Sequence, residues 1–144
     1  MCYALFIGSE TELDVPELDT AVDTDAFHLE ALQEHHSVVL PHFSTPFVYY
    51  AASWQGCGCG WFKDSMLLES PKKRRRSNGR TESDLLSLAG LLCDLGTAEL
   101  FLSWEGELDS EILRHVELAP GDFEMGSIPL EQGDFAIVRS AGPS

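Results

Sequence analysis

The stretch from Phe47 to Phe62, which reads FVYYAASWQGCGCGWF, constrains the fold more than any other part of the chain. It begins with FVYYAA, a run of aromatic and apolar residues without alternation, which is typical of a strand covered on both faces. The segment GCGCG follows soon after, and its glycines let the backbone adopt positive φ or come close to another group. We therefore expect an interior strand of a sheet, followed by a turn that carries two thiols.

The two thiols of this turn, Cys57 and Cys59, share one face if the segment is extended, because side chains alternate along a strand. Two residues at a rise of ~3.3 Å put their Cα atoms roughly 6.6 Å apart. This separation is at the outer limit for a disulfide and suits two thiolates that bind one metal ion. The chain has four cysteines and no export signal, which indicates reduced thiols. Cys93 lies in an apolar helical pattern and is expected to be a small core residue.

The first functional hypothesis is a metal site in which Cys57 and Cys59 bind zinc. Cys2, at the start of a neighbouring predicted strand, or a histidine would complete the ligand set, because zinc prefers thiolate and imidazole. The candidate histidines are His28, His35, His36 and His42. However, Cys-x-Cys differs from the usual C-x-x-C half-site, and no second pair is present. The alternative is that the cysteines only pack, as small apolar groups beside Trp54 and Trp61.

Charge is distributed unevenly along the chain and favours a basic protein as partner. The formal net charge is -15, yet six of the nine basic residues lie in the block KKRRRSNGR, from Lys72 to Arg80. The rest of the chain holds three basic and 24 acidic residues, a net charge of -21. Such a surface repels nucleic-acid phosphate, whose binding depends on Lys and Arg. The second hypothesis is therefore an acidic binding or inhibitor module, like an immunity protein, for a basic protein.

A thiol-dependent enzyme is the third hypothesis. A reactive thiol needs its pKa lowered by a nearby cation or helix terminus, and no helix is predicted to start beside Cys57 or Cys59. Cys2 follows Met1, as in hydrolases with an N-terminal cysteine, but the chain is short for that architecture. The sequence has no G-x-x-x-x-G-K-[ST], no G-x-G-x-x-G after a strand and no G-x-S-x-G motif. The balance of these observations is against an enzyme.

Further elements are indicated by hydrophobic patterns along the chain. Predicted strands are Cys2–Ile7, Phe27–Ala31, Leu100–Trp104, Ile112–Leu118 and Asp134–Ser140. A short helical turn is predicted over Gln33–Leu40 and ended by Pro41. Apolar residues at helical spacing predict the main helix from Thr81 to a stop at Gly96.

Two charged segments are expected to be irregular. Residues 9–25 are rich in Asp and Glu, without Lys or Arg, which is typical of a solvated loop. Residues 64–81 end in the basic block and are expected to form an exposed, mobile loop that is disordered or folds back on the acidic body. An engagement of the acidic loop with a cationic partner is the functional alternative.

These elements predict an α+β fold for residues 1–144, a single domain with a mixed sheet of five or six strands and one main helix packed on it. A chain of this length can bury a hydrophobic core without needing disulfides or a structural metal for stability. Every apolar stretch is far shorter than the ~20 residues that span a bilayer, and the start of the chain does not read as a signal peptide. We therefore expect a soluble protein of the cytoplasm, without membrane or nucleic-acid partners.

The chain also resembles a group of small bacterial proteins to which no activity is assigned. The members begin with Met-Cys and an apolar strand, here Met1 to Ile7. They carry the signature Tyr-Tyr-x-x-Ser-x-x-Gly-Cys-Gly-Cys-Gly-aromatic, here Tyr49 to Trp61, and the run Leu100 to Gly106 is similar as well. The resemblance points to Cys2, Cys57 and Cys59 without giving them a task, and the KKRRR block departs from the group's pattern.

Overall fold

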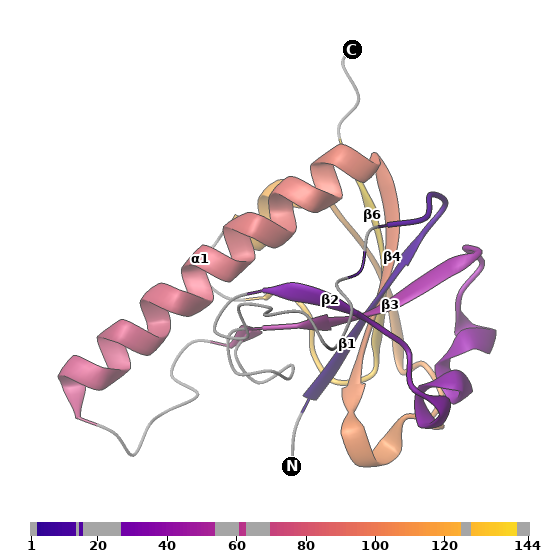
Figure 1. Ribbon diagram of the computed structural model, residues 1–144, viewed down its shortest axis with the longest axis horizontal. Helices are drawn as coiled ribbons and strands as arrows, with labels where there is room; N and C mark the ends of the chain where they lie inside the picture. The colour runs from indigo at the N-terminus through magenta and orange to yellow at the C-terminus, as the bar shows by residue number, and fades with distance from the viewer. Residues whose placement is uncertain are drawn as a thin grey trace.

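A computed structural model of the protein describes residues 3–13, 15, 27–53, 61–62, 70–124 and 128–140, apart from the side chains of residues 73, 74, 76 and 77. Six strands form one sheet in the order β2-β3-β1-β4-β6-β5 (Figure 1). They are β1 (Tyr3–Ser9), β2 (His28–Ala31), β3 (Phe47–Ala52), β4 (Thr97–Trp104), β5 (Arg114–Leu118) and β6 (Asp134–Arg139). Neighbours are antiparallel except for the parallel β5–β6 pair. The predicted α+β fold with a mixed sheet is confirmed.

The middle of the sheet is the β1–β4 pair, in which Leu5 lies opposite Leu102 and Phe6 opposite Phe101. All four side chains are fully buried, because both faces of the sheet are covered. β3, predicted as an interior strand, lies between β2 and β1. β2 forms one edge of the sheet, within the strand predicted over residues 27–31.

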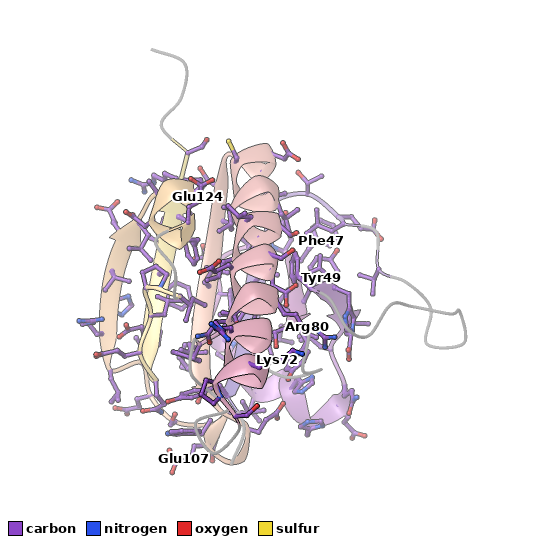
Figure 2. The ribbon with its side chains drawn as sticks, turned by 90° about the vertical axis from the view of Figure 1, so that its left-hand side faces the viewer. Phe47, Tyr49, Lys72, Arg80, Glu107 and Glu124 are labelled. Atoms are coloured by element: carbon purple, nitrogen blue, oxygen red, sulfur yellow. The ribbon has the colours of Figure 1, made fainter. Side chains whose placement is uncertain are left out.

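One face of the sheet is covered by α1 (Pro71–Leu95), which lies across the strands in Figure 2. Its residues Leu85, Leu88 and Leu92 are almost completely buried in the core on this face. The helix ends at Gly96, as predicted. Gly96 has φ 76, a left-handed conformation that glycine adopts without a Cβ penalty, and its N–H donates to the carbonyl of Cys93 at 3.3 Å. The predicted packing of one main helix on the sheet is confirmed.

The start of α1 corrects two predictions. The helix begins at Pro71 rather than at Thr81, so residues 71–81 are helical and not part of a loop. Proline is favoured in the first turn of a helix, and Lys and Arg are good helix formers, which outweighs the turn signal of the Ser-Asn-Gly that follows them. The prediction that Cys93 is a small core residue is also wrong, because its side chain is exposed on α1. Residues 63–69 lie outside the described residues.

The opposite face is covered by η1 (Glu34–His42), a 3-10 helix that packs on β1 and β3. It includes Pro41, so it runs past the predicted end at Leu40. The chain that follows it crosses Gly8 so closely that a Cβ there would clash with Thr45 and with the ring of Phe43. The connection is fixed by Glu99, which is 7% exposed and accepts hydrogen bonds from the backbone N–H groups of Ser44 and Thr45, each at 2.9 Å.

Two short 3-10 helices complete the described elements, η3 (Glu105–Glu107) directly after β4 and η4 (Pro120–Glu124) beside α1. An ion pair stabilises the parallel β5–β6 pair. Arg114 of β5 donates hydrogen bonds to both carboxylate oxygens of the buried Asp134 of β6, at 3.0 and 2.6 Å. Among the described residues, no helix combines the length and apolarity that a bilayer crossing demands.

Candidate metal site

The predicted thiol ligands Cys2, Cys57 and Cys59 lie outside the described residues. The residues that flank them are described. Tyr3, directly after Cys2, has its ring centroid 4.6 Å from that of Phe62, three residues after Cys59. The neighbouring Trp61 is fully buried and donates its indole N–H to the carbonyl of Ala51 in β3, at 3.3 Å. Tyr3 and Phe62 therefore lie in contact at the start of β1.

A cluster of ligand-type side chains lies on the η1 face of the sheet. His35, His36 and Glu105 each place one potential ligand atom within 4.8 Å of the other two. His35 Nε2 lies 3.9 Å from Glu105 Oε2. The two histidines come from the first turn of η1 and the glutamate from the start of η3, so two elements distant in sequence meet here.

These groups line a polar hollow of about 280 Å³. Its lining consists of Glu30, Gln33, His35, His36, Tyr50 and Glu105. Glu30 comes from β2 and Tyr50 from β3, so the hollow is lined by the edge strand and its neighbour on one side and by η1 and η3 on the other. The hollow holds two imidazoles and two carboxylates, the donor types that first-row transition metals bind.

His36 is the buried member of the cluster, with 4% of its surface exposed. Its ring stacks on Tyr50, with centroids 5.1 Å apart and an interplanar angle of 5°, and meets the edge of Phe6 at 5.3 Å. Burial lowers the pKa of His36 below its ordinary value of 6.5, and the charge of nearby His35 lowers it further, against Glu105 and Glu30. The ring is therefore neutral at pH 7, which is the form that binds metals.

The hydrogen bond to His36 also fixes its tautomer. The backbone N–H of Gln33 donates to Nδ1 of His36 at 3.1 Å, as part of a capping box at the start of η1. A neutral ring whose Nδ1 accepts carries its proton on Nε2. His36 can therefore offer a lone pair to a metal ion only after this cap opens, whereas His35 and Glu105 take no part in the cap and form the accessible pair of the site.

The other two candidate histidines lie apart from the cluster. His28 Nε2 is 2.7 Å from Glu30 Oε2 within β2, so it reaches the hollow only through that carboxylate. His42, in the last turn of η1, lies 3.3 Å from the carbonyl of Ser110 and packs on Phe101. The structure thus brings together two of the four histidines and adds Glu105, which the sequence did not indicate.

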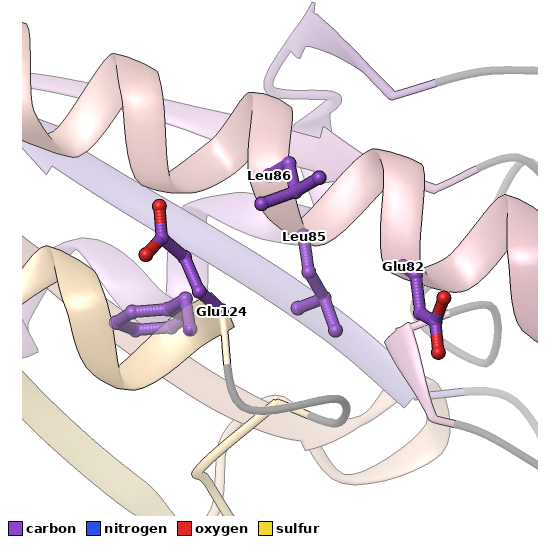
Figure 3. A pocket seen from close by; sticks show the side chains of 5 residues that line it. Glu82, Leu85, Leu86 and Glu124 are labelled. Atoms are coloured by element: carbon purple, nitrogen blue, oxygen red, sulfur yellow. The ribbon is translucent and has the colours of Figure 1, made fainter.

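A second hollow lies between α1 and η4 and has a volume of about 290 Å³ (Figure 3). Its apolar lining is Leu85, Leu86 and Phe123, and its polar lining is Glu82 and Glu124. Figure 3 shows Glu82 and Glu124 on opposite sides of the leucines. A groove with an apolar floor and two carboxylates suits a ligand that carries both apolar and cationic groups.

Comparison with known proteins does not assign a function to these residues. No protein-family model, no curated protein and no solved structure matches the chain.

Proposed function

We propose that the protein binds a divalent transition-metal ion, zinc by preference, in the hollow between η1 and η3. The observation that carries the proposal is the convergence of His35, His36 and Glu105 within 4.8 Å. Ligand atoms around a tetrahedral zinc ion at ~2.0–2.2 Å lie roughly 3.4 Å apart, so the three ligand atoms have to draw together by up to about 1.4 Å. Two histidines and one glutamate leave a fourth position open for water or a ligand.

The order of events follows from the hydrogen bond at His36. His35 and Glu105 bind the ion first, and Nδ1 of His36 joins when it releases the backbone N–H of Gln33. Glu30, in the lining of the hollow, adds a second negative charge close to the ion. An overall net charge of -15 attracts cations toward the molecule and favours this uptake.

The test is a calorimetric zinc titration of tag-free protein. We expect Glu105→Gln to weaken binding roughly tenfold or more, because loss of a ligand costs at least as much as loss of an outer partner. The matched control is Glu107→Gln, two residues further along η3, exposed and outside the hollow. Wild-type protein that takes up no zinc, or equal affinity in the Glu105 and Glu107 variants, contradicts the site.

A thiol site formed by Cys57, Cys59 and Cys2 is the second candidate for the same function. The contact of Tyr3 with Phe62, 4.6 Å between centroids, supports it, because each of these two residues is within three positions of a cysteine in the sequence. Cobalt distinguishes the candidates in the same titration. Thiolate ligands give an intense charge-transfer band in the near ultraviolet that nitrogen and oxygen ligands lack. A band that is lost in Cys57→Ser but kept in Glu105→Gln assigns the metal to the thiols.

A basic, partly apolar protein segment is the partner that we propose for the groove between α1 and η4. The two carboxylates around an apolar floor support it. An amphipathic Lys-Leu peptide is the probe, measured by fluorescence anisotropy at low salt. We expect the Glu82→Gln, Glu124→Gln double variant to bind it several-fold more weakly than Glu107→Gln, Glu111→Gln, which removes the same charge from exposed positions elsewhere. Equal binding by both double variants counts against the groove.

A further inference from the structure

The sheet ends at β5 on the side away from β2. Figure 2 shows β5 as the outermost strand on the left, beyond the yellow β6. No strand in the described part of the chain pairs with the outer side of β5. The edge of a sheet presents a row of N–H and C=O groups that a further strand can extend. The outer side of β5 is therefore a place where another polypeptide could bind.

The hydrogen bonds to β6 show which backbone groups of β5 face outward. The N–H of Arg114 donates to the carbonyl of Gly133, at 3.4 Å on the β6 side. Residues that bond to a neighbouring strand alternate along a ladder, so Arg114 and Val116 face β6. The N–H and C=O groups of His115 and Glu117 therefore point away from the sheet. Within the described residues, neither group has a backbone hydrogen bond outside the ladder.

The charged side chains of β5 do not protect this edge. Edge strands are commonly protected by lysine, proline or charges that face outward. Arg114 instead donates to both carboxylate oxygens of Asp134, in β6. Glu117 Oε1 lies 3.0 Å from Nη1 of Arg139, also in β6. Both charged side chains thus turn toward the neighbouring strand, and β5 contains no proline or lysine.

A hollow of about 230 Å³ opens beside the edge. It is lined by His115, Val116, Glu117, Phe135 and Ile137. Phe135 belongs to the core on the η1 face, and its ring centroid lies 5.8 Å from that of His115. Directly before β5, Leu113 is 70% exposed, and a large exposed apolar side chain next to a hollow is typical of an interaction surface.

The segment that carries β5 is strongly acidic. Residues 109–124 contain five acidic side chains and a single Lys or Arg, which is Arg114. The five are exposed, and they are Asp109, Glu111, Glu117, Asp122 and Glu124. Arg114 already pairs with the buried Asp134, at 2.6 Å. The charge around this edge therefore favours a cationic partner.

We propose that an extended segment of a basic protein pairs with the outer edge of β5 and adds one more strand to the sheet. Its side chains alternate between the two faces. On the η1 face it carries Lys or Arg, whose apolar stems fill the hollow beside Phe135 and Ile137 and whose charges meet Glu117. On the α1 face it carries apolar side chains, next to the half-buried Val116 and Leu118.

A basic strand is favoured over a second copy of this chain. Two copies each carry a net charge of -15 and repel one another, whereas a cationic segment is attracted. The side chains of Arg139 and Glu117 are 62% and 72% exposed, and ion pairs so exposed contribute little. Glu117 can therefore exchange Arg139 for a cation of the partner. The edge shares no lining residue with the metal hollow or with the groove between α1 and η4.

A peptide of alternating lysine and valine tests the pairing by fluorescence anisotropy at low salt. The Glu82→Gln, Glu124→Gln protein is the background, because its altered groove no longer competes for the cationic peptide. In this background we expect Glu117→Pro to bind the peptide roughly tenfold more weakly than Glu117→Gln. Both lose the carboxylate, but only proline loses the outward N–H, which is worth about one hydrogen bond. Equal affinities, or no binding in this background, overturn the proposal.

Modified peptides test the pairing without any change in β5. Two peptides of the same sequence carry N-methyl groups either on the lysines or on the valines, so that each lacks the N–H groups of one edge. We expect one of them to bind roughly tenfold more weakly than the other, because an added strand pairs through only one of its edges. If both bind with the same affinity, backbone pairing at β5 is refuted.

Two further measurements test the chemistry of the partner. A peptide of alternating glutamate and valine is expected to bind at least tenfold more weakly than the lysine peptide, and equal binding of the two contradicts a basic partner. Sedimentation velocity of the protein alone tests the second copy. We expect a monomer at low salt, and a dimer that Glu117→Pro abolishes and Glu117→Gln keeps would assign the edge to self-association instead.

Discussion

At the scale of single residues, His36 shows how burial and a cap restrict what a side chain can do. Its ring is 4% exposed, lies flat on Tyr50 and accepts a hydrogen bond from the N–H of Gln33. Burial and the accepted hydrogen bond both favour the neutral ring over the charged one. The same residue therefore caps the start of η1, and in the proposed metal site it would become a ligand only by giving up that role.

The lowered pKa of His36 makes part of the stability dependent on pH. Because the folded-state pKa lies below the ordinary 6.5, the unfolded chain binds the proton first. The contribution of neutral His36 is thus complete above about pH 6.5 and decreases as the pH falls below it. In urea unfolding with EDTA present, we expect the stability difference between wild type and His36→Gln to shrink from pH 7.5 to pH 5. A difference that is constant, or that grows, contradicts this assignment.

At the scale of elements, the connection from η1 to β3 is held against the centre of the sheet. Glu99 of β4 accepts hydrogen bonds from the backbone N–H groups of Ser44 and Thr45. Gly8 of β1 leaves the space in which Phe43 and Thr45 cross the strand. This crossing keeps η1 on its face of the sheet, and with it the two histidines of the proposed site.

The space at Gly8 gives a direct prediction. In Gly8→Ala, the new Cβ would lie 2.6 Å from Cδ1 of Phe43, so the connection has to shift. We expect a loss of about 1–3 kcal/mol in the free energy of unfolding, the usual cost of overpacking. Gly121→Ala is the control, since its Cβ meets no described atom within 4 Å. Equal urea midpoints for the two variants would show that the connection yields without cost.

The elements were predictable from the sequence where burial imposes a pattern. Continuous apolar runs identified β1 and β3, and alternation identified the part of β4 from Leu100 to Trp104. Apolar residues at helical spacing identified the second half of α1. The first half of α1 has no apolar periodicity, so composition was the only signal and it was read as a loop. The candidate site escaped prediction for another reason. Glu105 meets His35 only because β4 and η1 are brought together by the strand order, which local patterns do not encode.

At the scale of the whole molecule, the sheet separates two surfaces with different proposed tasks. His35, His36 and Glu105 lie on the face covered by η1, whereas α1 lies on the other. The metal and the basic segment proposed for the groove between α1 and η4 would therefore bind on opposite sides of the sheet. Substitutions at one surface leave the contacts of the other intact, so the two proposals succeed or fail separately.

The place of β1 in the middle of the sheet has a consequence for how the chain is made. Its neighbours β3 and β4 are synthesised later, and β4 ends only at Trp104. On the ribosome, the apolar run of β1 therefore keeps at least one unpaired edge until β4 has emerged. The nascent protein is therefore most prone to aggregation before that point, and a chaperone that holds this first strand would have its greatest effect there.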